Sequence, residues 1–96
     1  MPAVPVELVL APEAELDISE GRRGGRGEEF LSSVDACLES IRRGPEMYPV
    51  VHEGYRRSLI RRFPYAVFYE RSEATVTIYA VFHTSRDPDK WRQRLT

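Results

Sequence analysis

The chain has 96 residues, of which 42% are hydrophobic and 30% are charged, and its formal net charge is −1. This balance is ordinary for a folded domain and excludes a chain that is intrinsically disordered. No apolar run approaches the roughly 20 residues needed to cross a bilayer, and the first residues lack the features of a signal peptide. The single cysteine permits no internal disulfide. We therefore expect one cytoplasmic domain over residues 1–96, with no membrane association.

The small net charge conceals a polarity along the chain. Residues 1–53 carry eleven acidic side chains against five arginines, whereas residues 54–96 carry nine basic side chains against four acidic ones. A basic end attracts phosphate groups or an acidic protein segment. All the basic residues except Lys90 are arginines, which stay charged and bind through two parallel hydrogen bonds. Because arginine exchanges protons less readily than lysine, this shortage of lysine counts against an acid/base enzyme.

Hydrophobic periodicity predicts the elements of the N-terminal half. Residues 6–10 alternate as a strand, and residues 12–20 form a short helix that begins with a proline and is rich in acids. A glycine-rich turn over residues 21–27 leads to a longer helix over residues 28–43, which Gly44 and Pro45 end. The apolar face of this longer helix comprises Phe30, Val34, Cys37, Leu38 and Ile41. We therefore expect Cys37 to lie in the core.

The C-terminal half reads as strands. Residues 49–54 are expected to form a connection, followed by strands over residues 55–60, 65–71 and 75–83. Alternation in the last strand places Val76, Ile78, Ala80 and Phe82 on one face. Residues 89–95 form a short helical tail. This order predicts an α+β domain: an N-terminal strand, a two-helix hairpin packed on an antiparallel sheet of three to four strands, and the C-terminal tail.

The candidate functional residues are mostly basic. Four arginines lie on or beside one strand, so alternation directs them to both faces, and at least one of each pair is expected to be structural. The other candidate basic residues lie nearer the C-terminus and are expected to extend a basic surface. The whole candidate set comprises Arg56, Arg57, Arg61, Arg62, Arg86, Lys90, Trp91, Arg92 and Arg94. His83 is expected to be structural, because its neighbours Thr84, Ser85 and Asp87 offer hydrogen-bond partners for a corner that holds Arg86. With two histidines and one cysteine, a metal site is not expected, and no cofactor motif occurs.

Several segments together carry a resemblance to a known family. They are residues 11–17 (APEAELD), 29–31 (EFL), 45–49 (PEMYP), 61–69 (RRFPYAVFY) and 83–88 (HTSRDP). The pattern, which spans about residues 5–94, resembles the RelE/ParE toxin family of type II toxin–antitoxin systems. It is closer to the ParE-like branch, because RelE-like nucleases have an active site rich in lysine and arginine. The chain departs from the family at the helical hairpin, where Arg26 stands at an apolar position and is expected to point outward.

This resemblance implies a bacterial toxin that arrests growth and serves in plasmid stabilisation. ParE-like toxins bind DNA gyrase and stabilise its cleaved-DNA state, which needs a shaped surface and no catalytic pair. The alternative is a metal-independent, ribosome-dependent mRNA endonuclease of the RelE type, with catalytic candidates Arg61, His83, Arg86 and Tyr69. A third possibility is an inactive toxin fold that only binds a partner. In each case the resemblance implies a hetero-oligomer in which an acidic or amphipathic C-terminal segment of a cognate antitoxin wraps the toxin.

Overall fold

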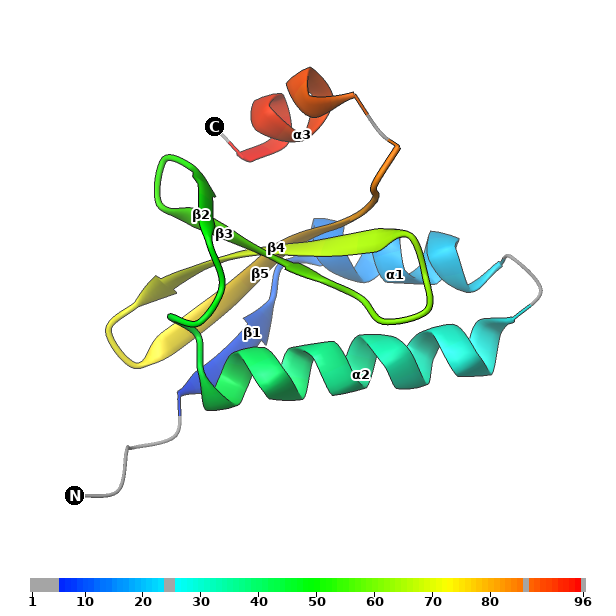
Figure 1. Ribbon diagram of the computed structural model, residues 1–96, viewed down its shortest axis with the longest axis horizontal. Helices are drawn as coiled ribbons and strands as arrows, with labels where there is room; N and C mark the ends of the chain where they lie inside the picture. Colours follow the sequence, from blue (N-terminus) through cyan, green and yellow to red (C-terminus); the bar gives the residue numbers. More distant parts are fainter. Residues whose placement is uncertain (1–5, 24–25, 86, 96) are drawn as a thin grey trace.

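The computed structural model describes residues 6–23, 26–85 and 87–95. In chain order the elements are a strand, two helices, four strands and a short helix (Figure 1). This order confirms the predicted α+β class and adds a strand, β2, where a connection was expected. The bounds are β1 (Glu7–Leu10), α1 (Pro12–Arg22), α2 (Gly27–Arg43), β2 (Val50–His52), β3 (Tyr55–Leu59), β4 (Tyr65–Ser72), β5 (Thr75–His83) and α3 (Pro88–Leu95).

The five strands form one mixed sheet in the order β1-β5-β4-β3-β2. The strands from β2 to β5 pair in antiparallel fashion, whereas β1 runs parallel to β5 at the other edge. The expectation of three to four antiparallel strands therefore missed two things. The edge strand β2 pairs with β3 through Val50 and Arg56, and β1 reaches β5 only because the rest of the domain provides a long crossover between them.

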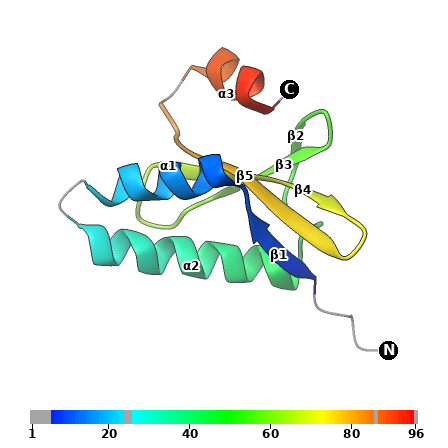
Figure 2. The same ribbon diagram turned by 180° about the vertical axis from the view of Figure 1, so that it is seen from behind.

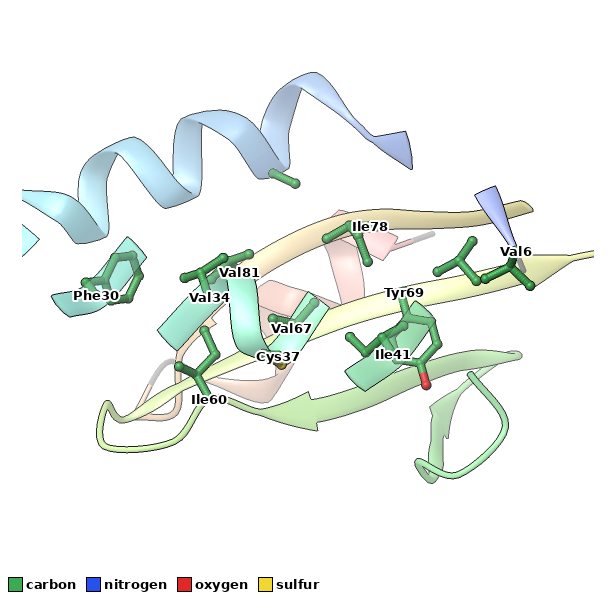
Figure 3. Close-up of a cluster of buried hydrophobic side chains, with 12 residues drawn as sticks. Val6, Phe30, Val34, Cys37, Ile41, Ile60, Val67, Tyr69, Ile78 and Val81 are labelled. Carbon is green, nitrogen blue, oxygen red and sulfur yellow. The ribbon is translucent and has the colours of Figure 1, made fainter. Parts of the chain in front are cut away.

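The sheet separates two apolar layers. Helices α1 and α2 cover one face and α3 lies over the other (Figures 1 and 2). The larger layer lies on the helix-hairpin side and is built from the predicted stripe of α2 together with inward residues of the sheet (Figure 3). Within that stripe, Phe30, Val34, Cys37 and Ile41 are buried, as predicted, and Leu38 is partly buried. The smaller layer, beneath α3, comprises Ala66, Phe68, Ala80, Phe82, Trp91 and Leu95.

The predicted alternation of β5 does not hold along its whole length. Tyr69 pairs with Ile78 but the preceding Phe68 pairs with Ala80, so Tyr79 is an extra residue in a β-bulge. Ile78 therefore faces the helix hairpin, whereas Ala80 belongs to the layer beneath α3. The prediction of one continuous face was wrong. Apolar residues occupy both faces of β5, so the hydrophobic pattern of the sequence does not reveal that side chains change face at the bulge.

The helices differ little from their predicted bounds. Helix α1 continues two residues past the predicted end, to Arg22, and α3 begins at Pro88, whose fixed φ suits a first helical position. Arg26 precedes α2 and is exposed, as expected, with an ion pair to Glu29 and its guanidinium over the ring of Phe63. No helix within the described ranges is long and apolar enough to span a bilayer.

Candidate functional site: a groove between α2 and β3

A groove of about 380 Å³ runs between α2 and the outer edge of β3. One wall is a row of small residues on α2, the floor is a buried thiol and hydroxyl, and the other wall is the end of β3 with the turn that follows it. None of the described residues that line the groove is acidic. They are Ser32, Ser33, Ala36, Cys37, Ser40, Tyr48, Ser58, Leu59, Arg61 and Arg62.

Two local features keep this groove open. Ser32, Ala36 and Ser40 follow one another at intervals of four on α2, so the helix presents a stripe of short side chains. On the other side, the pairing between β2 and β3 does not extend to the C-terminal end of β3. The hydrogen bond nearest that end runs from the Arg57 amide to the Pro49 carbonyl at 3.1 Å. The backbone of Leu59, two residues further on, therefore lies at an edge that no strand covers.

The floor of the groove is inert. Cys37 Sγ lies 3.3 Å from Ser58 Oγ and 3.9 Å from the carbonyl oxygen of Leu59. Both side chains are buried, and burial raises the pKa of the Cys37 thiol above its usual range, with an opposing contribution from the Ser58 hydrogen bond. The thiol is therefore protonated at neutral pH and belongs to the core, as predicted, rather than acting as a nucleophile.

The loop between α2 and β2 is fixed to the sheet by two side chains of neighbouring strands. Arg56 donates to the carbonyl oxygens of Tyr48 at 2.6 Å and Glu46 at 3.3 Å. The hydroxyl of Tyr69 donates to the Pro45 carbonyl at 2.6 Å. Arg56 therefore has the structural role expected for one member of its pair, and it lies on the helix-hairpin side of the sheet beside its cross-strand partner Tyr69. The salt bridge expected for one member of the second pair is not found, because neither Arg61 nor Arg62 makes one within the described ranges.

Tyr69 lies in the core and not at an open site. Its side chain is fully buried (Figure 3), and this burial raises the pKa of Tyr69 to about 12, the nearby Arg56 acting in the opposite direction. A phenol that holds its proton so firmly and already donates to a carbonyl is poorly placed to exchange protons with a bound RNA. Tyr69 is thus buried in the core, unlike Arg61 and His83, which are exposed.

His83 and Arg61 lie at the same end of the sheet. His83 pairs with Tyr65 and its ring lies 5.1 Å from that of Tyr65, while Tyr65 also accepts the amide of Ile60, the residue before Arg61. The backbone of Ile60, next to Arg61, is therefore about two strand spacings, roughly 10 Å, from that of His83. His83 Nδ1 accepts hydrogen bonds from the amide of Ser85 at 3.1 Å and from its hydroxyl at 2.7 Å, which is the predicted corner. Arg86 lies outside the described residues.

The basic residues divide into paired and unpaired groups. Arg71 forms an ion pair with Glu46 at 2.6 Å, and Arg42 and Arg43 pair with Glu39. In contrast, four cations of the candidate set make no hydrogen bond or ion pair through their side chains within the described ranges, and two of them line the groove. We name these four the free cations: Arg57, Arg61, Arg62 and Lys90.

Two other candidates, Trp91 and Arg94, hold α3 on the sheet, and Arg92 contacts residues of α3 itself. Trp91 is buried and stacks on Phe68 with ring centroids 5.0 Å apart, and the guanidinium of Arg92 lies over the indole. Arg94 lies over the ring of Phe82 and forms an ion pair with Asp17 at 2.9 Å. Their positions give these side chains a packing role in the isolated chain.

Asp17 is a residue whose role the sequence did not reveal. Its carboxylate accepts the amide of Val81 at 3.0 Å in addition to the ion pair with Arg94. It therefore satisfies an edge amide of β5 beyond the end of β1 and joins α1, β5 and α3. In the sequence it was one of several acids in the first helix, and nothing marked it as buried. Across the described ranges, no three His, Cys, Asp or Glu side chains gather as a metal site.

Comparison with known proteins identifies the family. A family model described as "ParE toxin of type II toxin-antitoxin system, parDE" matches residues 8–88. The chain belongs to this family. The resemblance stated from the sequence is thereby confirmed, and no protein with a curated description matches the sequence at a significant level.

Two solved structures share the fold of this ParE-family chain. The first belongs to the chromosomal ParDE system from P. aeruginosa, with 15% identity, a TM-score of 0.62, and coverage of 81% of this chain and 95% of that one. The second belongs to the toxin–antitoxin complex RelBE2 from Mycobacterium tuberculosis, with 23% identity, a TM-score of 0.64, and coverage of 85% and 94%. At these identities the likeness establishes the fold alone.

Two of the motif segments of this ParE-family chain contribute residues to the groove. Residues 45–49 form the loop that Arg56 and Tyr69 fix in place, and residues 61–64 form the turn between β3 and β4 that carries two free cations. Arg62 adopts a positive φ of 71° in this turn, a conformation unusual for a side chain of its size.

Proposed function

We propose that this ParE-family toxin arrests bacterial growth by binding DNA gyrase, and that a cognate antitoxin neutralises it by covering the groove. The observation that carries this proposal is the position of Arg61 and Arg62 at the groove without any carboxylate partner. Most other described arginines are held by carbonyl or carboxylate groups. Guanidinium groups left open in this way attract phosphate or acidic protein surface. A gyrase complex on DNA offers both.

A mechanism based on binding agrees with the burial and hydrogen bonding of the candidate catalytic groups. An inhibitor needs a complementary surface, whereas RNA cleavage needs a base for the 2′-hydroxyl, an acid for the leaving oxygen and a cation for the developing charge. Tyr69 is buried with its hydroxyl already donated. His83 uses Nδ1 to accept from Ser85. These hydrogen bonds favour a surface that inhibits its target by binding rather than by catalysis.

The proposed antitoxin segment is acidic and amphipathic, and it acts in the cytoplasm as part of a hetero-oligomer. Leu59, which lines the groove with Arg61 and Arg62, leaves 62% of its surface exposed, and Met47 in the loop after α2 leaves 81% exposed, which is unusual for large apolar side chains. A disordered segment that folds on binding would cover both kinds of surface at once. The neighbouring structures are named as a ParDE system and a toxin–antitoxin complex, which supports a partner of this kind.

The test is induction of the chain alone in bacteria that carry a DNA-damage reporter, beside a purified gyrase assay. We expect growth arrest, a rise of the reporter and accumulation of cleaved DNA. The double substitution Arg61→Gln/Arg62→Gln should reduce all three and weaken antitoxin binding. The matched control Arg22→Gln/Arg23→Gln removes the same charge from the last turn of α1, outside the lining of the groove, and should change none of these quantities. A silent reporter together with arrested growth would exclude gyrase as the target.

One observation favours a second candidate, the RelE-like endonuclease. His83 and Arg61 share the open end of the sheet, so a strand of mRNA could contact both. In that case Arg61 or Arg86 would stabilise the phosphorane, and His83→Ala would abolish ribosome-dependent cleavage of mRNA while leaving antitoxin binding intact. Normal growth with intact antitoxin binding would instead indicate a toxin fold that has lost its activity.

A further inference from the structure

The groove between α2 and β3 offers a set of hydrogen-bond donors converging from both walls. From α2, Ser32, Ser33 and Ser40 bring hydroxyl groups, and from the turn after β3, Arg61 and Arg62 bring guanidinium groups. Each guanidinium presents five N–H donors in a fixed plane, and each hydroxyl can donate once. No carboxylate among the described lining residues competes for these donors.

The edge of β3 adds backbone groups to this wall. The amide of Arg57 points to β2 and the amide of Ile60 points to β4. Because backbone groups alternate in direction along a strand, those of Leu59 point away from β4. The approach of Cys37 Sγ to the Leu59 carbonyl at 3.9 Å agrees with this direction. The backbone edge at Leu59 therefore faces the groove.

The size of the groove sets a limit on what it can hold. A volume of about 380 Å³ lies near the lower end of small-molecule sites, which span roughly 300–1,000 Å³. The stripe of Ser32, Ala36 and Ser40 is short enough to admit a ligand against the helix. Tyr48, whose ring meets that of Tyr69 edge-on with centroids 6.5 Å apart, adds a fixed aromatic side chain to the lining.

We propose that this groove binds a phosphate group carried on a polar molecule of nucleotide size, with Arg61 and Arg62 on the phosphate oxygens and the serines of α2 on the remaining acceptors. A phosphate offers at least three acceptor oxygens and up to two negative charges, which suits two guanidiniums and several hydroxyls better than a carboxylate with two oxygens. Tyr48 provides a face for the organic part of the ligand. The site uses the same two arginines as the proposed gyrase contact, but it is argued from the donors that line the groove and its test does not require that function.

The phosphate could belong to a free nucleotide or to the backbone of a nucleic acid, so the test uses probes of both kinds. Purified chain is titrated by calorimetry with adenosine monophosphate, with a single-stranded oligothymidylate, and with glutarate as a dianion that lacks phosphate. We expect saturable binding of a phosphate probe that exceeds glutarate binding by about tenfold. Binding of the mononucleotide identifies a nucleotide site, and binding of the oligonucleotide alone identifies a backbone phosphate.

Two variants separate a shaped site from general attraction to positive charge. Arg61→Gln/Arg62→Gln removes the cations, and Ala36→Leu fills the groove without changing charge; each should weaken binding by about tenfold or more. Arg22→Gln/Arg23→Gln lowers the net charge equally and should leave binding within about twofold. Should Ala36→Leu fail to fold, Ser33→Leu fills the same groove from the adjacent position.

The outcomes are decisive. The proposal is overturned if neither phosphate probe binds saturably, if glutarate binds as tightly, or if the filled groove binds as well as the native one. Because these titrations require neither gyrase nor growth arrest, their failure is distinguishable from failure of the proposed function.

Discussion

Replacement of Tyr69 by Phe tests whether this tyrosine acts in the core or in chemistry. The substitution keeps the ring, which is fully buried, and removes only the hydroxyl that donates to the Pro45 carbonyl at 2.6 Å. Pro45 is itself buried, so its carbonyl oxygen loses a partner that water cannot readily replace. The substitution should therefore lower the free energy of unfolding and loosen the loop that carries Met47.

The size of the effect follows from the burial of both groups. A buried hydrogen bond contributes about 0.5–1.5 kcal/mol, and an acceptor left unsatisfied costs about 1–3 kcal/mol. We expect the free energy of unfolding to fall by about 1–3 kcal/mol, with a fall in melting temperature of roughly 4–8 °C for each kcal/mol. Tyr65→Phe is the matched control on the same strand, because Tyr65 makes ring contacts but no side-chain hydrogen bond; it should cost less than about 0.5 kcal/mol.

The effect of the same substitution on stability should depend on pH in the alkaline range. Burial raises the pKa of Tyr69 to about 12, above the value of about 10 expected when the chain is unfolded. The folded state thus holds the phenolic proton more tightly, so the resulting stability is complete below about pH 10 and is lost as the pH rises through about 12. Phe cannot lose a proton. The stability difference between the native chain and the variant should therefore shrink by about 2–3 kcal/mol between pH 10 and pH 12.

Urea unfolding at several pH values, followed by tyrosine and tryptophan fluorescence, measures both effects. Growth arrest after mild induction should persist in Tyr69→Phe, since the fold remains populated at 37 °C and no step of binding uses this hydroxyl. Unchanged stability combined with complete loss of mRNA cleavage would refute the structural assignment and return Tyr69 to the catalytic candidates.

Three further outcomes follow from individual contacts. Phe30→Ala should lower the free energy of unfolding by about 3–5 kcal/mol in urea titrations, because this ring is 1% exposed in the main core; a loss below about 1 kcal/mol would contradict that packing. Asp17→Asn removes the charge that holds Arg94 and should speed amide exchange in α3 by several-fold while the central strands stay protected; uniform exchange would count against this link. The Cys37 thiol should react with a thiol reagent about 100-fold more slowly in the native chain than in urea, and equal rates would show that it is accessible.

Much of the fold was predictable because its determinants are local. The stripe of α2 depends on spacings within one helix, and four of its five predicted residues are buried while Leu38 is partly buried. The helix bounds followed from a proline, a glycine-rich turn and a Gly-Pro pair. Arg56 and Arg57 were expected on opposite faces of one strand, and they lie opposite Tyr69 and Phe68, which belong to the two different layers.

The features that were missed depend on tertiary pairing. Strand β2 has only three residues and stands between Pro49 and a turn that contains Glu53 and Gly54, both with positive φ, so its sequence is typical of a connection. It becomes a strand only because β3 offers it an edge. The bulge at Tyr79 was hidden because apolar residues occupy both faces of β5, so a shift of register leaves the hydrophobic pattern intact.

The candidate site shows why charge along a sequence is an incomplete guide to charge on a surface. The positive C-terminal half does not remain separate from the acidic half, because Arg71 reaches Glu46 and Arg94 reaches Asp17 across the fold. These pairs neutralise part of the polarity that composition suggested. Two of the four free cations, Arg61 and Arg62, lie at the turn after β3, where the strand has no neighbour to supply carbonyl groups and the adjoining stretch of α2 supplies serines instead of acids. The guanidinium groups at this turn therefore have N–H donors that no acceptor of the described chain occupies. A partner or ligand that supplies negative groups there does not have to displace an existing ion pair.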